Sequence, residues 1–192
     1  MTNDRREPPL RCDTLQRRAI VVRAHALGVP VDYGRARALP IVREPASLAF
    51  IGEDIQSRAQ WLAPPAAAAF LRMRGQASRD SIVLQVVSAF RSAEYQLGIL
   101  ERKLERRLSM DEILRVSAAP GYSEHHSGRA IDLTTPGFTL LEEVFEQSDA
   151  FAWLTANAAR FGFSLSYPRG NPHRIAYEPW HWCWHRPSTK RT

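Results

Sequence analysis

The chain has 192 residues, of which 44% are hydrophobic and 24% charged, and this composition is typical of one globular domain. Its net charge is +6 and its isoelectric point about 9.9. The basic residues are scattered rather than gathered on a helix with stacking aromatics, which argues against nucleic-acid binding. Two explanations of the positive charge remain: a solvated surface, or attraction to an anionic cell wall.

No apolar run is long enough for a membrane helix, and the first residues lack the apolar segment of a signal peptide. We therefore expect a cytoplasmic monomer without a membrane span. The alternative is a protein that reaches the cell envelope by a non-classical route.

The N-terminal part of the chain predicts helix and loop without recognisable chemistry. Asp13 and Gly28 bound a predicted helix. Its apolar stripe is expected at Leu15, Ala19, Val22 and Ala26. Proline and glycine predict a loop-rich connection after this helix, and a short strand is expected at 48–51. We interpret residues 1–60 as an extension of the same domain.

The middle of the chain predicts a helix, a buried strand and two more helices. Pro64 and Pro65 are tolerated in the first turn of a helix. The run at 82–87 is apolar and β-branched, which favours a buried strand ending just before Arg91. In the next helix, over 92–108, the core-facing residues are expected to be Tyr95, Ile99, Leu100 and Leu104. Ser109 and Glu112 form a capping box for a further helix.

Two short motifs carry the residues of a metal site. The first, PGYSEHHSGRAIDL at 120–133, contains His125 and Asp132, and the second, EPWHW at 178–182, contains Glu178 and His181. Zinc binds imidazole and carboxylate ligands, and a catalytic site keeps three protein ligands and one open position. His125, Asp132 and His181 are the predicted zinc ligands.

The local patterns indicate how these side chains meet. Asp132 alternates with two large apolar neighbours, as in a strand, and Gly128 allows the chain to bend back toward it. Glu178 and His181 would lie on opposite faces of a regular strand, but Pro179 favours a bulge or loop that returns them to one face. Glu178 is then free to act on a water molecule.

The remaining histidines and cysteines have weaker patterns. His126 adjoins His125 and is expected to face away from the metal if the segment is extended. The alternative is that His126 is the ligand and His125 is not. His25 is expected to be a surface or packing residue. Cys12 and Cys183 define no disulfide framework, and Cys183 is interpreted as a buried structural thiol in preference to a ligand.

The C-terminal part predicts helical segments over 140–161 with a break near Ser148, then a strand at 163–167. Residues 61–186 are interpreted as the functional core. Residues 187–192 are expected to be a flexible tail.

The motifs together resemble the D-alanyl-D-alanine carboxypeptidase family of zinc peptidases, in particular its VanY-like branch. This family shares its metal-site fold with lysostaphin-type peptidases and the hedgehog domain. The matching residues are Ser123, His125, Gly128, Ala130 and Asp132, then Glu178, Trp180 and His181, and an earlier block from Ser88 to Ser92 with Gln96. The resemblance covers roughly residues 60 to 184. It implies an α+β fold in which a small, mainly antiparallel sheet carries the zinc site between flanking helices.

The resemblance also implies an activity: hydrolysis of D-Ala-D-Ala-type bonds in the peptides of peptidoglycan. Glu178 would be the general base, Arg91 would grip the substrate carboxylate and Ser123 would bind substrate. Without the resemblance, Arg91 would be a surface residue that caps the next helix, and Ser123 a residue that bonds the turn backbone. The alternative functions are an endolysin-like endopeptidase and a non-catalytic, metal-stabilised interaction domain. The chain departs from the family after the second motif, at Cys183-Trp184-His185.

Overall fold

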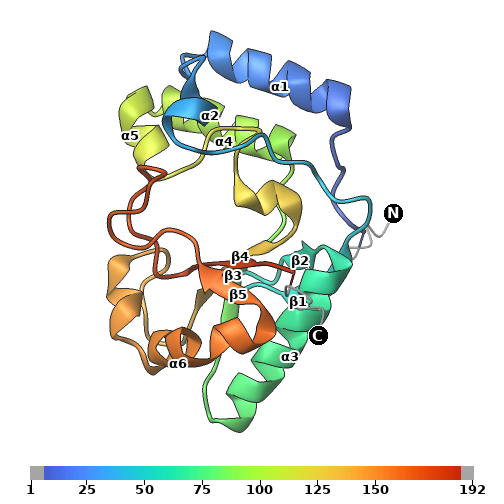
Figure 1. The fold of residues 1–192 in the computed structure, drawn as a ribbon, viewed down its shortest axis with the longest axis vertical. Helices are drawn as coiled ribbons and strands as arrows, with labels where there is room; N and C mark the ends of the chain where they lie inside the picture. The colour runs from blue at the N-terminus through green and yellow to red at the C-terminus, as the bar shows by residue number, and fades with distance from the viewer. Residues whose placement is uncertain (1–6, 187–192) are drawn as a thin grey trace, which may run out of the picture.

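The computed structural model describes residues 7–186 and has an α+β fold (Figure 1). Its central element is an antiparallel sheet in the order β3-β4-β6-β5. The strands are β3 (Gln85–Ser88), β4 (Ala130–Thr134), β5 (Phe163–Leu165) and β6 (His181–Trp184). The expected small antiparallel sheet is confirmed, while the expected tail at 187–192 lies outside the described residues.

Helices cover both sides of this sheet (Figure 1). One side carries α1 (Thr14–Ala26), α2 (Tyr33–Ala36), α4 (Ala93–Glu105) and α5 (Met110–Arg115). The other side carries α3 (Pro64–Arg79) and α6 (Asp149–Asn157). Three 3-10 turns complete the fold, η1 (Glu124–Ser127), η2 (Glu143–Gln147) and η3 (Ala158–Phe161). Within residues 7–186, no helix has the length and apolar character needed to cross a bilayer.

Two hydrophobic clusters form the core, one on each side of the sheet. The first joins α3 and α6 to the sheet and includes Ile131 and Leu133 of β4. The second joins α1, α4 and α5 and includes Leu97 and Ile113. Because side chains alternate along a strand, Asp132 points away from the first cluster and toward the space between the two.

A separate hairpin packs against α3. Its strands are β1 (Ala49–Glu53) and β2 (Ala59–Leu62). The backbone N–H of Ile55 donates to the carbonyl of Val86 in β3, which ties the hairpin to the main sheet. The hairpin crosses the predicted boundary at residue 60 between the extension and the core. That division of the chain stays a prediction.

The predicted face of α1 is wrong. Leu15 and Val22 are 74% and 66% exposed, whereas Ile20 and Ala24 are buried and pack in the second cluster. The run from Ala19 to Val22 is apolar on every side, so helical periodicity alone does not select the face that contacts α4.

The expected core face of α4 is also wrong at one residue. Tyr95 is 53% exposed and Leu97, which was not predicted, is buried, whereas the predicted burial of Leu100 is confirmed. The predicted strand at 82–87 begins later than expected, at Gln85, because Ile82 caps the end of α3 by bonding to the carbonyl of Ala77.

Candidate metal centre and substrate cleft

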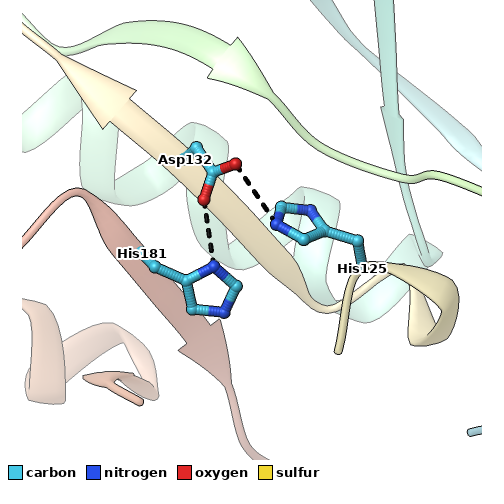
Figure 2. Close-up of side chains that lie close together, drawn as sticks. All are labelled: His125, Asp132 and His181. Carbon is cyan, nitrogen blue, oxygen red and sulfur yellow. Dashed lines mark hydrogen bonds and ion pairs between the residues drawn. The ribbon is translucent and has the colours of Figure 1, made fainter. Parts of the chain in front are cut away.

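His125, Asp132 and His181 meet at the face of the sheet that lies between the two hydrophobic clusters (Figure 2). Asp132 Oδ2 lies 3.2 Å from His125 Nε2, and Asp132 Oδ1 lies 3.0 Å from His181 Nδ1. One ligand atom from each residue falls within 4.8 Å of the others, and all three residues are buried. The donor set is the one that zinc accepts, two imidazoles and one carboxylate.

The sheet positions two of these residues and a 3-10 turn positions the third. Asp132 and His181 are direct partners in the register of the adjacent strands β4 and β6. His125 lies in η1, which ends at Gly128 with φ of 64°. A Cβ atom on Gly128 would lie 2.8 Å from the backbone nitrogen of Ala63, so only glycine fits this turn without a backbone shift.

His125 is oriented for metal binding by its other ring nitrogen. Its Nδ1 lies 2.6 Å from the carbonyl oxygen of Ala89, which selects the tautomer with the proton on Nδ1. Its Nε2 is buried without a hydrogen-bond partner in the described structure. Burial, together with the charge of Arg91, lowers the pKa of His125 to about 4, although the carboxylate of Asp132 opposes the shift. A neutral ring with one orphaned nitrogen is suited to a metal ion.

A chain of hydrogen bonds connects this ligand to the β1–β2 hairpin. The backbone N–H of Ala89 donates to Gln60 Oε1 over 2.9 Å, and Gln60 Nε2 donates to Asp54 Oδ2 over 2.8 Å. Asp54 also accepts from the backbone N–H groups of Gln56 and Arg58. The hairpin therefore fixes the carbonyl that orients His125.

His126 is buried but uses both ring nitrogens in hydrogen bonds. Its Nδ1 lies 2.7 Å from the carbonyl oxygen of Arg91, and its Nε2 accepts from the backbone N–H of Gly121 over 3.1 Å. The segment is not extended, because η1 is a helical turn in which both histidines are buried. His126 is outside the ligand group and fixes the backbone at Arg91 instead.

Glu124, which no sequence pattern indicated as a site residue, contacts His181 from the side opposite Asp132. Glu124 Oε2 lies 2.9 Å from His181 Nε2. Burial opposes the charge of Glu124, but its hydrogen bond to His181 outweighs burial and lowers the pKa of Glu124 to about 2. Burial likewise opposes the charge of His181, but the bonds to Asp132 and Glu124 raise its pKa to about 10. Only its place in SEHH, beside His125, could have signalled this contact.

Glu178 lies beside the ligand group and is not part of it. A turn at Pro179, closed by the backbone N–H of His181 to the carbonyl of Glu178, brings the two side chains to 3.7 Å. The expected loop at Pro179 is confirmed. Burial raises the pKa of Glu178 to about 7, although the neighbouring His181 charge opposes this shift. A carboxyl group with this pKa is suited to accept and return protons.

A cleft of about 400 Å³ opens beside these residues. All the predicted site residues line it: Arg91, Ser123, His125, Asp132, Glu178 and His181. Lys103 and Tyr167 also line the cleft, and neither was predicted as a site residue. The buried hydroxyl of Ser123 does not cap η1. Arg91 Nε is buried without a hydrogen-bond partner in the described structure, so the residue does not cap α4 with this atom.

A larger groove of about 1110 Å³ also contacts Arg91, along α4 and the hairpin. It contains none of the three clustered ligands, so the chemistry belongs to the smaller cleft. Cys183 is buried in β6 and Cys12 is partly buried, and both are free thiols. The structural interpretation of Cys183 agrees with this placement, because it lies outside the ligand group.

Two histidines and an aspartate, buried at the base of a cleft with a free carboxyl group beside them, define the class of mononuclear metallohydrolases. The model of the VanY D-alanyl-D-alanine carboxypeptidase family matches residues 59–187. The chain belongs to this family, as its motifs had predicted.

Individual relatives agree with this assignment. A Bacillus subtilis protein, YodJ, provisionally named a carboxypeptidase, is 31% identical over 154 residues, which are 75% of this chain and 55% of the relative. The D-alanyl-D-alanine carboxypeptidase of Enterococcus faecalis is 28% identical over 55% of this chain and 41% of its own length. The chain thus spans about half the length of the curated relatives it matches.

Among solved structures, the LD-carboxypeptidase LdcB is 30% identical, with a TM-score of 0.64, over 76% of this chain and 71% of its own. A vancomycin-resistance D,D-pentapeptidase VanY variant in complex with Zn(II) has the same fold, with 21% identity, a TM-score of 0.58, and coverage of 76% and 82%.

Proposed function

We propose that the protein is a zinc-dependent carboxypeptidase that removes a C-terminal D-amino acid from the stem peptides of peptidoglycan. The observation that carries the proposal is the buried His125–Asp132–His181 group with Glu178 beside it. Retention of a free carboxyl group favours catalysis over a purely structural metal site, because a structural site needs no base. Membership of the VanY family supports the substrate class.

The three clustered residues would hold the metal. When bound, zinc acts as a Lewis acid that polarises the scissile carbonyl and lowers the pKa of water toward about 7. Glu178 accepts the proton of the attacking water and then donates it to the nitrogen of the leaving amino acid. Burial, which favours the protonated form of Glu178, assists this second step.

Arg91 would bind the C-terminal carboxylate of the substrate. Its guanidinium lines the cleft, and its backbone is held at both ends by the metal-site turn: the N–H donates to the carbonyl of His125 and the carbonyl accepts from His126. A planar fork suits a carboxylate. Ser123, buried at the cleft wall, would donate a hydrogen bond to the peptide.

The test is release of free D-alanine from a purified pentapeptide by the zinc-loaded protein. We expect Glu178→Gln to retain zinc but to reduce kcat by at least about 10²-fold, the usual contribution of a general base. Chelation should abolish release in the wild-type protein. Zinc binding without release from any peptide would exclude the carboxypeptidase and favour an endopeptidase, for which intact sacculi are the next substrate.

A second candidate is cleavage of an L,D bond. LdcB is an LD-carboxypeptidase and is among the structures most similar to this chain. A tetrapeptide that ends in one D-alanine distinguishes the two activities, because its terminal bond joins an L-centre to D-alanine. Release from the tetrapeptide alone would assign the protein as an L,D-carboxypeptidase with the same site residues.

A further inference from the structure

The cleft contains two cationic side chains, and neither forms a salt bridge with a carboxylate of the described residues. Arg91 and Lys103 both line it. The salt bridges within residues 7–186 include neither residue. Since a partly buried charge without a partner is costly, each position indicates a site for a ligand anion.

The two cations approach the cleft from opposite ends of α4. Arg91 directly precedes the N-cap residue, Ser92, whereas Lys103 lies in the last turn. Ile99 lies one turn before Lys103 and also lines the cleft, so this face of α4 forms the wall between them. The backbone positions of the two residues lie at opposite ends of α4, so each side chain enters the cleft at its own point along the helix and can take a separate anionic group of one ligand.

The environment of Lys103 also favours an anion. Burial and the nearby charge of Arg91 lower the pKa of Lys103, and the carboxylate of Glu178 opposes this shift without cancelling it. A carboxylate in the cleft would offset both effects. The choice of residue is specific, since only Lys103 and Lys190 among the 26 basic residues are lysines. An ammonium group on a flexible stem reaches a side-chain carboxylate without the planar geometry that arginine imposes.

We propose that Lys103 binds a second carboxylate of the substrate and thereby selects stem peptides whose diamino acid carries a free side-chain carboxylate, as diaminopimelate does. This inference rests on the proposed function. Arg91 takes the terminal carboxylate, and Lys103 takes the carboxylate on the diamino acid. Lys103 is a specificity-determining residue in this arrangement, and Glu178 and the metal ligands perform the chemistry.

The test compares two stem peptides that differ in one group, the side-chain carboxylate of diaminopimelate or its carboxamide. The wild-type protein should prefer the free carboxylate about tenfold in kcat/KM, because a hydrogen bond between charged groups contributes on that order. In Lys103→Met the ratio should fall to about one, and in Lys103→Glu it should invert. Lys103→Arg should restore the preference. Arg102→Met, which removes a charge from the exposed side of the same turn, is the matched control and should keep the wild-type ratio.

The same ratio is measured in binding, as the Kd of each peptide for zinc-loaded Glu178→Gln protein with and without Lys103→Met. This readout separates the two proposals. If no peptide is cleaved but the Kd ratio falls with Lys103→Met, the proposed activity fails and the carboxylate site stands. If cleavage is observed and Lys103→Met reduces kcat/KM equally for both peptides, Lys103 acts on the terminal carboxylate or on helix structure, and the inference is overturned.

Discussion

Glu124 contributes to the metal site through His181, and its contribution is measurable as metal affinity. Its carboxylate accepts from His181 Nε2, so that Nδ1, the nitrogen that faces Asp132, would be the one to bind the metal. We expect Glu124→Ala to weaken zinc binding about 10- to 100-fold, and Glu124→Gln, which retains a hydrogen-bond acceptor, to weaken it less. Competition with a fluorescent chelator measures the Kd. The exposed Glu142→Gln variant is the control, and equal affinities for all four proteins would contradict the prediction.

The sequence predicted which residues cluster at the candidate metal centre more completely than it predicted their neighbours. His125, Asp132 and His181 lie in ordered motifs, and the structure brings all three together as expected. Glu124 lies in the same motif but acquires its contact only because η1 coils and β6 passes beside it. Lys103 belongs to a run of charged residues at 101–107, a pattern that is typical of a solvent-exposed helix face. Its place in the cleft depends on how α4 packs, which the run itself does not encode.

For the helices and strands too, features set by local sequence were predicted, and features set by tertiary packing were not. Capping residues located the helices well: the box at Ser109 and Glu112 begins α5, and Asp13 caps α1. The faces of α1 and α4 were predicted less well, because each helix offers more apolar residues than one contact surface can bury. The role of the hairpin in orienting His125 depends on a hydrogen bond between Gln60 and Ala89, 29 residues apart, and no local pattern predicts it.

The hairpin itself has a pH-dependent stability that originates at Asp54. Burial opposes its charge, but backbone N–H groups of Arg58 and Gln56 and the Arg58 side chain outweigh burial and lower the pKa of Asp54 below its ordinary value of 3.8. A lowered folded-state pKa stabilises the protein above the unfolded-state pKa. This stabilisation is lost as the pH falls below about 4, through the still lower folded-state value.

We therefore expect Asp54→Asn to reduce the free energy of unfolding by about 1–3 kcal/mol at pH 6. The difference from wild type should shrink at pH 3, where Asp54 is mostly protonated in the unfolded chain. Urea denaturation at both pH values measures it. Glu53→Gln, at an exposed neighbouring position, should change little. A constant difference across pH would show that the loss comes from packing and has no electrostatic origin.

The molecule as a whole places its candidate metal site between two hydrophobic clusters, one on each side of the sheet. The site joins η1, β4 and β6, whose ligands are separated by up to 56 residues from His125 to His181. A metal ion that binds only the folded chain stabilises it by about 2.7 kcal/mol at a free concentration 100 times its Kd. For a chain of this length, that free energy corresponds to an increase in Tm of roughly 5–10 °C.

Metal removal should therefore destabilise the fold as well as abolish activity. We expect zinc to raise the Tm of the chelator-treated protein by this amount, and to leave the Tm of Asp132→Ala unchanged, because that variant loses the carboxylate shared by both histidines. His25→Ala is the control and should retain the full shift, since the His25 ring bonds to the carbonyl of Val29 and lies outside the candidate ligand group. If zinc raises the Tm of Asp132→Ala as much as that of wild type, the ion binds elsewhere, and the metal centre assigned to these three residues is wrong.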